Sequence, residues 1–128
     1  MTRGLADTSL FIARESGRAL EAAALPTTLA VSIVTAAELR AGVLGAADLA
    51  TRTRRLATLE IVLALEPLPI DGAVAEAWAG LRIALRDAGQ RMKVNDSWIA
   101  ATAIAHGVPV VTQDHDFDAI PGVDIIRV

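Results

Sequence analysis

The chain has 128 residues, a length that suits one domain. Its formal net charge of −3 argues against a broad phosphate-binding surface. It contains no cysteine, so disulfide frameworks, thiolate metal sites and cysteine nucleophiles are excluded. No apolar run reaches the ~18 residues that a membrane-spanning helix requires. Asp7 interrupts the apolar stretch that a signal peptide needs. We therefore expect a cytoplasmic protein with a single domain over residues 1–128.

The first half of the chain is predicted to alternate short strands with helices. A short apolar strand ends at Asp7, and a helix is expected over residues 14–25, where Pro26 ends it. The Val- and Ile-rich run over residues 29–34 has the composition of a buried strand. Two helices should follow, over residues 35–44 and 46–63.

The next segment is predicted to be a peripheral strand and an amphipathic helix. Residues 65–70 contain two prolines, which confine a strand to the edge of a sheet. After Asp71, one helical face is marked by apolar residues at spacings of four, three and four: Val74, Trp78, Leu81 and Leu85. This helix should end at Gly89, and both Trp78 and the later Trp98 are expected in the core.

The C-terminal part is expected to hold one helix and two strands. Asn95 and Asp96 are predicted to cap the helix, which should end at Gly107. Residues 108–112 and 123–128 are rich in β-branched residues and are predicted to be strands. Strands that alternate with helices indicate an α/β fold, in which a mainly parallel sheet lies between two layers of helices.

Five carboxylates fall where parallel strands end or the following helices begin: Asp7, Glu38, Asp96, Asp114 and Asp116. In open α/β sheets, ligands bind outside the carboxyl ends of the strands. Two carboxylates about 5 Å apart repel each other by roughly 3 kcal/mol at an effective dielectric constant of 20. A hard divalent cation removes this repulsion, and a site made only of oxygen ligands favours Mg²⁺ or Mn²⁺. The pattern therefore predicts a metal site that could activate water for attack on a phosphodiester.

Each acid also has a purely structural interpretation. Thr35 and Glu38 match a capping box, in which Glu38 would bind the Thr35 amide. Asp96 could act only as a helix cap, and the acids on either side of His115 could form an Asx turn. Asp7 could likewise belong to a simple turn. The placement of all five acids at one edge of the sheet favours the metal site over these separate explanations.

Four motifs occur in order and together resemble the PIN-domain family, in particular the VapC toxins of bacterial toxin–antitoxin pairs. They are Asp7-Thr8-Ser9, Thr35-Ala36-Ala37-Glu38-Leu39-Arg40-Ala41-Gly42, Asn95-Asp96-Ser97-Trp98-Ile99-Ala100-Ala101 and Val111-Thr112-Gln113-Asp114-His115-Asp116-Phe117. The resemblance runs from Leu5 to the end of the sequence. The first strand, Gly4-Leu5-Ala6, is less β-branched than is usual in such toxins.

The resemblance implies helices around a parallel sheet and an endoribonuclease that depends on Mg²⁺, or on Mn²⁺ as a substitute. It also implies a cognate VapB-like antitoxin that occludes the active site, and toxin dimers within a larger toxin–antitoxin assembly. Carried over by motif, the catalytic and metal-binding acids would be Asp7, Glu38, Asp96 and Asp114. Asp116 would be an accessory acid, and Ser9 and Thr112 would be polar neighbours that orient a carboxylate or a water.

Two other functions are compatible with parts of the pattern. A phosphotransfer enzyme could use Asp7 as its nucleophile, but Ser9 stands where a dehalogenase-type phosphatase has a second Asp. The only lysine, Lys93, does not follow a late strand as it does in a receiver domain. A catalytically silent binding module of the same fold is the second alternative. If RNA is the substrate, Arg40 or Arg91 are candidates to contact its backbone.

Overall fold

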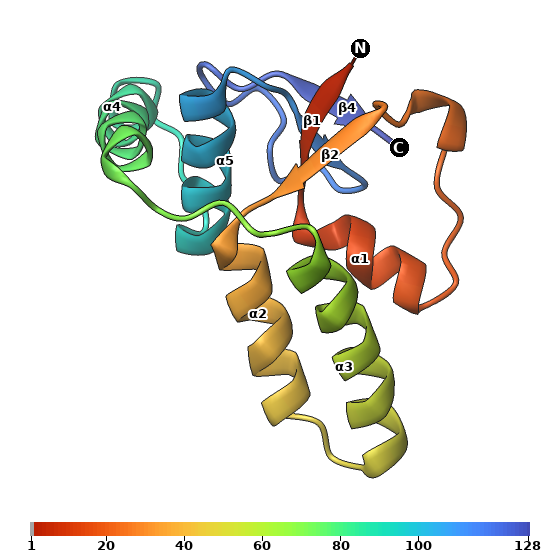
Figure 1. The fold of residues 1–128 in the computed structure, drawn as a ribbon. Coiled ribbons are helices and arrows are strands. Elements are labelled where there is room, and N and C mark those ends of the chain that lie inside the picture. The colour runs from red at the N-terminus through yellow and green to blue at the C-terminus, as the bar shows by residue number, and fades with distance from the viewer. Residues whose placement is uncertain (1) are drawn as a thin grey trace.

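The computed structural model describes residues 2–128, and its centre is a sheet of four parallel strands in the order β2-β1-β3-β4 (Figure 1). The first strand in the sequence is therefore an inner strand of the sheet. The strands are β1 (Arg3–Ala6), β2 (Thr28–Val31), β3 (Val110–Thr112) and β4 (Ile125–Arg127). This arrangement confirms the predicted α/β fold with a parallel sheet.

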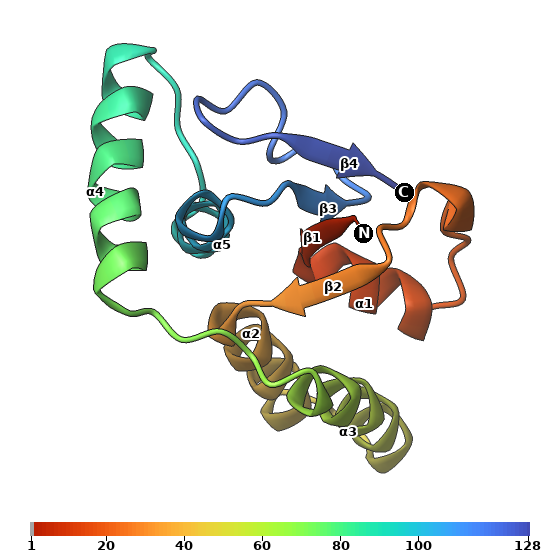
Figure 2. The same cartoon turned by 45° about the horizontal axis from the view of Figure 1, so that its top comes forward.

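Helices cover both faces of the sheet (Figure 2). On one face α5 lies against the strands and α4 packs outside it, whereas α1, α2 and α3 lie on the other side (Figure 2). The bounds are α1 (Thr8–Glu15), α2 (Ile33–Leu44), α3 (Leu49–Ala64), α4 (Gly72–Asp87) and α5 (Val94–His106), with a short 3-10 turn, η1 (Ala22–Ala24). Within residues 2–128, none of these helices combines the length and the apolar character needed to cross a bilayer.

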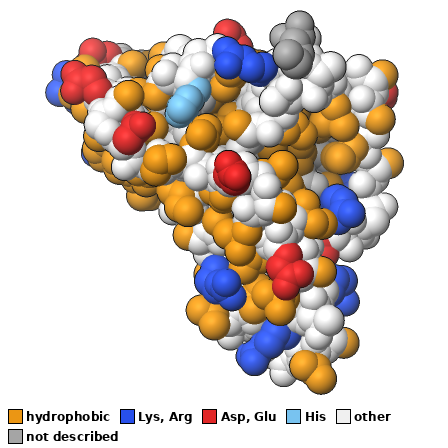
Figure 3. All heavy atoms as spheres, in the orientation of Figure 1, with side chains coloured by type: hydrophobic (Ala, Val, Ile, Leu, Met, Phe, Trp, Pro, Cys, Tyr) orange, Lys and Arg blue, Asp and Glu red, His pale blue; other side chains and the backbone are white. Residues whose placement is uncertain are grey.

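Alternation along the two inner strands divides the apolar interior into two cores. Successive side chains of a strand point to opposite faces of the sheet. Leu5 and Val110 belong to the core beneath α4 and α5, whereas Ala6 and Val111 belong to the core beneath α1, α2 and α3. Figure 3 shows apolar side chains on the surface as well, mixed with charged ones over α2 and α3. The large exposed apolar residues of these two helices are Ile33, Leu44, Leu49, Leu56, Ile61 and Leu63.

The helix predicted over residues 14–25 is wrong, because α1 begins directly after β1 and ends at Glu15. The Asp7 side chain accepts a hydrogen bond from the Thr8 amide and so caps the helix at its start. Gly17 then adopts a φ of +75°, a conformation that favours glycine and ends the helix. The Ala-rich residues that follow form only η1 and bury no side chain there.

Other predicted boundaries shift because short polar side chains cap the helices. The strand predicted over residues 29–34 stops at Val31, since Ser32 accepts a hydrogen bond from the Val34 amide and starts α2 two residues earlier than predicted. Asp48 similarly caps α3. The strand predicted over residues 65–70 is reduced to one bridge between Ser32 and Leu68.

The predicted cap of the last helix is also wrong. Lys93 occupies the cap position of α5, without a side-chain hydrogen bond to the helix, and Asp96 lies within the first turn. The left-handed Gly107 ends this helix as predicted, and the Asp71 side chain caps α4. The strand predicted over residues 108–112 begins two residues later and forms β3, and the strand predicted over residues 123–128 is shorter at both ends and forms β4. Trp78 and Trp98 stack on each other between α4 and α5 and are only partly buried, so they lie at the edge of the core.

Gly4 is required by the close approach of β1 to its surroundings. A Cβ atom at this position would lie 2.5 Å from Cγ2 of Val111 and 3.1 Å from Cγ of Pro26, and Val111 is fully buried. This packing explains why the first strand carries a glycine between more typical strand residues.

We expect Gly4→Ala to lower the free energy of unfolding by about 1–3 kcal/mol, because the added methyl group overpacks the sheet. Urea denaturation followed by circular dichroism measures this change. Gly80→Ala is the matched control: it adds the same methyl group inside α4, where nothing lies within 4 Å. It should leave stability unchanged or raise it by up to about 1 kcal/mol. Equal effects of the two substitutions would contradict the packing explanation.

Candidate metal centre

A cavity of about 330 Å³ lies at the carboxyl ends of the strands, and the five predicted acids all line it. They come from the end of β1, from α2, from α5 and from the loop after β3. The other residues that line it are Thr8, Ser9, Ile12, Arg18 and Lys93. Sequence positions more than a hundred residues apart, such as Asp7 and Asp114, therefore share one cavity.

Asp7 is the most buried of these acids, with only 3% of its surface exposed. Its backbone amide donates to the Val111 carbonyl at 2.9 Å, which continues the pairing of β1 with β3 by one residue. One carboxylate oxygen accepts from the Thr8 amide at 2.7 Å, and the other accepts from the Thr112 hydroxyl at 2.9 Å. Asp7 therefore caps α1 and also lines the cavity, so its structural and functional interpretations are compatible.

Burial raises the pKa of Asp7, and the nearby charge of Asp114 raises it further. Hydrogen bonds from the Ser9 and Thr112 side chains oppose this effect. The ionised form of the buried Asp7 carboxylate is therefore disfavoured, and a bound cation would stabilise it.

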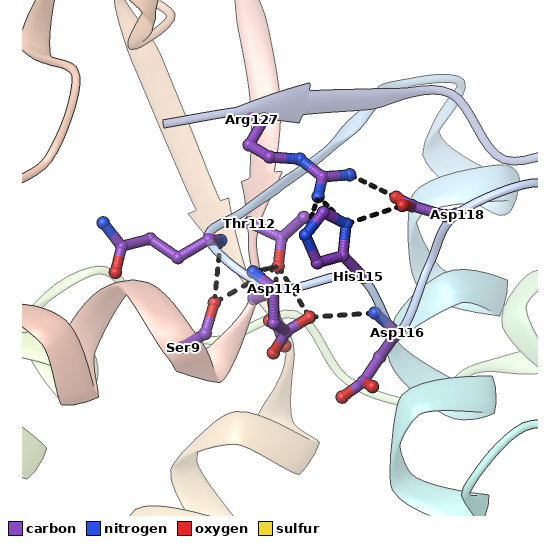
Figure 4. Close-up of polar contacts among 9 residues, drawn as sticks. Ser9, Thr112, Asp114, His115, Asp116, Asp118 and Arg127 are labelled. Carbon is purple, nitrogen blue, oxygen red and sulfur yellow. Dashed lines mark hydrogen bonds and ion pairs between the residues drawn. The ribbon is translucent and has the colours of Figure 1, made fainter.

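The hydroxyl group of Thr112 contacts polar groups from two segments of the site, the start of α1 and the loop after β3 (Figure 4). Its oxygen accepts from the Asp114 amide at 3.2 Å and lies 3.2 Å from the Ser9 hydroxyl, which itself accepts from the Gln113 amide at 3.1 Å. Its single proton can be donated to Asp7 at 2.9 Å or to Asp114 at 3.2 Å, but not to both at once. Thr112 therefore contacts both carboxylates, and Ser9 lies beside it.

Glu38 does not form the predicted capping box. The start of α2 is Ile33, so Thr35 lies inside the helix, and its amide is bound by the Ser32 carbonyl. Glu38 Oε1 instead accepts from the Thr8 hydroxyl at 2.8 Å, and the Thr8 oxygen lies 2.9 Å from that of Thr35. Thr8, which the sequence analysis did not single out, therefore links Glu38 of α2 to the first residue of α1.

Asp96 projects from the first turn of α5 into a field of negative charge. Partial burial is the main reason that its pKa rises to about 6, and the charges of Asp7, Asp116, Glu38 and Asp114 each add to the rise. All four of the other predicted acids thus lie close enough to act on this one carboxylate. A positively charged ion is the natural partner for such a group.

The loop after β3 carries Asp114 and Asp116 and is held from both sides (Figure 4). Asp114 Oδ1 accepts from the Asp116 amide at 3.2 Å, the hydrogen bond expected of an Asx turn. Further along the loop, Asp118 binds His115 and is paired with Arg127 of β4. These contacts lower the pKa of Asp118, with the His115 hydrogen bond as the largest cause. His115 therefore faces Asp118 and Arg127, and it does not line the cavity.

Two cations at the cavity were missed by the sequence analysis. Lys93 Nζ lies 3.9 Å from Asp116 Oδ2, and Arg18 also lines the cavity. Arg40, one of the two arginines proposed for RNA contacts, is not among the residues that line it. The position of Lys93 directly before the Asn-Asp pair is the only sequence signal that could have indicated its role.

The donor set is suited to a hard divalent cation. The acids of the cavity and its Thr and Ser hydroxyls offer oxygen ligands, and neither histidine lines it. Among residues 2–128, no three acidic or histidine side chains are close enough to form a ready-made cage. A cation held by one or two carboxylates, with water in its remaining positions, fits this open arrangement.

The pKa of Asp96 makes a prediction about stability. Its folded-state pKa of about 6 exceeds the ordinary value of 3.8, so the folded protein binds more protons than the unfolded chain between these values. The contribution of Asp96 to the free energy of unfolding should therefore fall as the pH rises from about 4 to about 6. Asp96→Asn should flatten this decline and raise the melting temperature at pH 7, which thermal unfolding across the pH range measures.

Glu76→Gln is the matched control, because it neutralises an exposed acid on α4 that does not line the cavity. It should keep the pH profile of the unaltered protein. An Asp96→Asn profile that coincides with that of the unaltered protein would contradict the electrostatic description of the site.

Comparisons with known proteins identify the family of this chain. The family model of the PIN domain matches residues 5–123 of this chain. Ribonuclease VapC5 of Mycobacterium tuberculosis is 53% identical, over 98% of this chain and 95% of the relative, and Ribonuclease VapC4 of the same organism is 48% identical over 98% and 97%. The crystal structure of VapBC-5, a member of the VapBC family of toxin–antitoxin systems from M. tuberculosis, superposes with a TM-score of 0.90 over the whole of both chains, at 48% identity. This chain belongs to the PIN-domain family, among the VapC proteins.

Proposed function

We infer that this chain is the toxin of a type II toxin–antitoxin pair and that it is an endoribonuclease, which hydrolyses RNA phosphodiester bonds. The single observation that carries this inference is the convergence of five carboxylates on one cavity, in a chain whose close relatives are named ribonucleases. Family membership also leaves no reason to favour the phosphotransfer alternative. An RNA-cutting toxin of this kind acts in the cytoplasm, where its substrates are.

The reaction depends on a divalent metal ion, and we propose Mg²⁺, with Mn²⁺ as its substitute. Asp7, Asp96 and Asp114 would hold the ion directly or through water, and Glu38 would bind it or orient the attacking water. Asp116 would be an accessory acid near the ion. When bound, such an ion lowers the pKa of a water molecule and stabilises the charge that develops on the phosphodiester. These roles are supported by the shared cavity and by the raised pKa of Asp96, because a bound cation would offset the repulsion among the acids.

The protein side chains contribute the arrangement of these groups. Thr112 donates to Asp7 or to Asp114, and Ser9 accepts from the Gln113 amide, so Asp7 after β1 is held beside the loop after β3. Thr8 donates to Glu38. Lys93 and Arg18 offer positive charge at the rim of the cavity, where an RNA phosphate would enter.

We further propose that a VapB-like antitoxin binds this toxin and covers its active site. The solved relative carries the VapBC designation of a toxin–antitoxin system, which supports a partner of this kind. We also propose a homodimer of the toxin within a larger toxin–antitoxin assembly.

Asp7→Asn tests the proposed activity. The substitution is nearly isosteric and removes a buried charge whose pKa is raised, so we expect RNA cleavage with Mg²⁺ to be lost while the melting temperature stays the same or rises. Cleavage of total RNA, with mapping of the new ends, and a thermal-shift assay measure the two effects. Asp124→Asn, which neutralises an exposed acid outside the cavity, should cleave normally.

Two results would argue against the proposal. Cleavage by Asp7→Asn at the rate of the unaltered protein would show that the acids are misassigned. Absence of cleavage by the unaltered protein, together with a melting temperature that does not respond to Mg²⁺ or Mn²⁺, would favour the catalytically silent binding module.

A further inference from the structure

A second cavity of about 330 Å³ lies between the C-terminal half of α4, the loop that follows it and the start of α5. Three arginines line it, Arg82, Arg86 and Arg91, together with the polar side chains of Gln90 and Ser97. None of the described residues that line it is acidic. Such a concentration of positive charge is notable in a chain whose formal net charge is −3.

Little of this positive charge is neutralised by the protein. Arg86 pairs with its neighbour Asp87 at 3.2 Å, but both side chains are largely exposed, and pairs of this kind contribute little. Arg91 makes no hydrogen bond or ion pair with another residue in the described range 2–128. The arginines are therefore available to a negatively charged ligand.

Arg82 is held in place by aromatic rings. Its guanidinium carbon lies 5.1 Å from the centroid of the Trp78 ring, which stacks on Trp98 with centroids 4.5 Å apart. The Trp78 ring nitrogen donates to the Ser97 hydroxyl at 3.0 Å, so the rings are fixed to the first turns of α5. A guanidinium ordered in this way loses less entropy when it binds a planar or tetrahedral anion.

The basic cavity adjoins the acidic one across a short loop. Arg91 and Val94 line the basic cavity, whereas Lys93 between them lines the acidic cavity. Four residues of extended chain span at most ~14 Å, so the two cavities lie within a few nucleotides of each other. The cap position of α5, at Lys93, provides no side-chain hydrogen bond, so the amides that begin this helix add to the positive potential of the loop.

We propose that the basic cavity binds backbone phosphates of the RNA substrate on one side of the bond that is cut. Arg82, Arg86 and Arg91 bind these phosphates, and Lys93 continues the positive path to the acidic site. This inference rests on the proposed ribonuclease function and identifies where the uncut part of the strand lies. Guanidinium groups match phosphate oxygens in a two-point geometry, and phosphate contacts position a nucleic acid without reading its sequence. The cavity therefore supplies affinity, and the choice of bases is made elsewhere.

The test compares two double variants in the full chain. Arg86→Gln with Arg91→Gln removes two charges from the basic cavity. Arg3→Gln with Arg52→Gln removes two charges from exposed positions on β1 and α3 that line neither cavity. We expect the first pair to raise KM for a fluorescent RNA oligonucleotide severalfold at unchanged kcat, and the second pair to leave both constants unchanged.

Salt dependence gives a second readout that a merely structural effect would not move. With the Asp7→Asn substitution present to prevent cleavage, the affinity for the same RNA is measured by anisotropy at increasing salt. The slope of log K against log salt should decrease in magnitude by about 1.4 when two single-strand phosphate contacts are lost. Replacing the same two arginines by lysine should restore most of the slope, because the charges are retained. If the double Gln variant does not fold, Arg91→Gln alone, in an exposed loop, gives about half the change.

The outcomes separate this inference from the proposed function. Absence of RNA cleavage by the unaltered protein would overturn the ribonuclease function and this inference with it. Normal cleavage, with the same KM and salt slope for both double variants, would overturn the basic cavity as an RNA site and leave the ribonuclease function intact. Loss of antitoxin binding by Arg86→Gln with Arg91→Gln, with KM for RNA unchanged, would assign the cavity to a protein partner instead.

Discussion

β1 and β3 pair side by side through Leu5 with Val110 and Ala6 with Val111. This pairing brings Asp7 within 2.9 Å of Thr112, although 105 positions separate them in the sequence. The same register sends neighbouring side chains to opposite cores, and it leaves no room for a side chain larger than hydrogen at Gly4. A shift of one residue would exchange the two cores and carry Asp7 away from the cavity.

The acidic site brings together carboxylates that repel one another, so the rest of the domain must stabilise their close approach. Asp7 is stabilised as the cap of α1 and by the Thr112 hydroxyl, which offsets part of its burial. Asp96 has less support: partial burial is the main cause of its raised pKa, and the charges of the neighbouring acids add to it. The site is thus arranged for a cation to complete it, and the arginines of the adjacent cavity lie outside this repulsion. The acidic and basic cavities lie on the two sides of one loop, so under our proposal an RNA strand would bind the basic cavity while its reacting phosphate lies at the acidic one.

The sequence predicted the structure well where the result depends on the periodicity of apolar residues or on the position of a residue at the end of a strand. The alternation of strands and helices predicted the parallel sheet, and the placement of acids after strands predicted that they would share one cavity. It was less informative where a single side-chain hydrogen bond decides a boundary. Asp7 starts α1, and Ser32 starts α2 although the Ile and Val residues that follow it favoured a longer strand. Thr8, Arg18 and Lys93 were missed because their roles come from neighbours that only the folded chain supplies.

The position of β3 and β4 late in the sequence has a consequence for the synthesis of the protein. β1 is made before its inner partner, β3. β3 carries Thr112 and leads to Asp114, and it is made only after α1 to α5. Folding during translation proceeds from the N-terminus, and an inner strand cannot form its ladder until its partner exists. The growing chain therefore cannot bring Asp7 beside Thr112 and Asp114 until β3 has been made. The acidic cavity of this ribonuclease stays incomplete while the helices that carry Glu38 and Asp96 are being made.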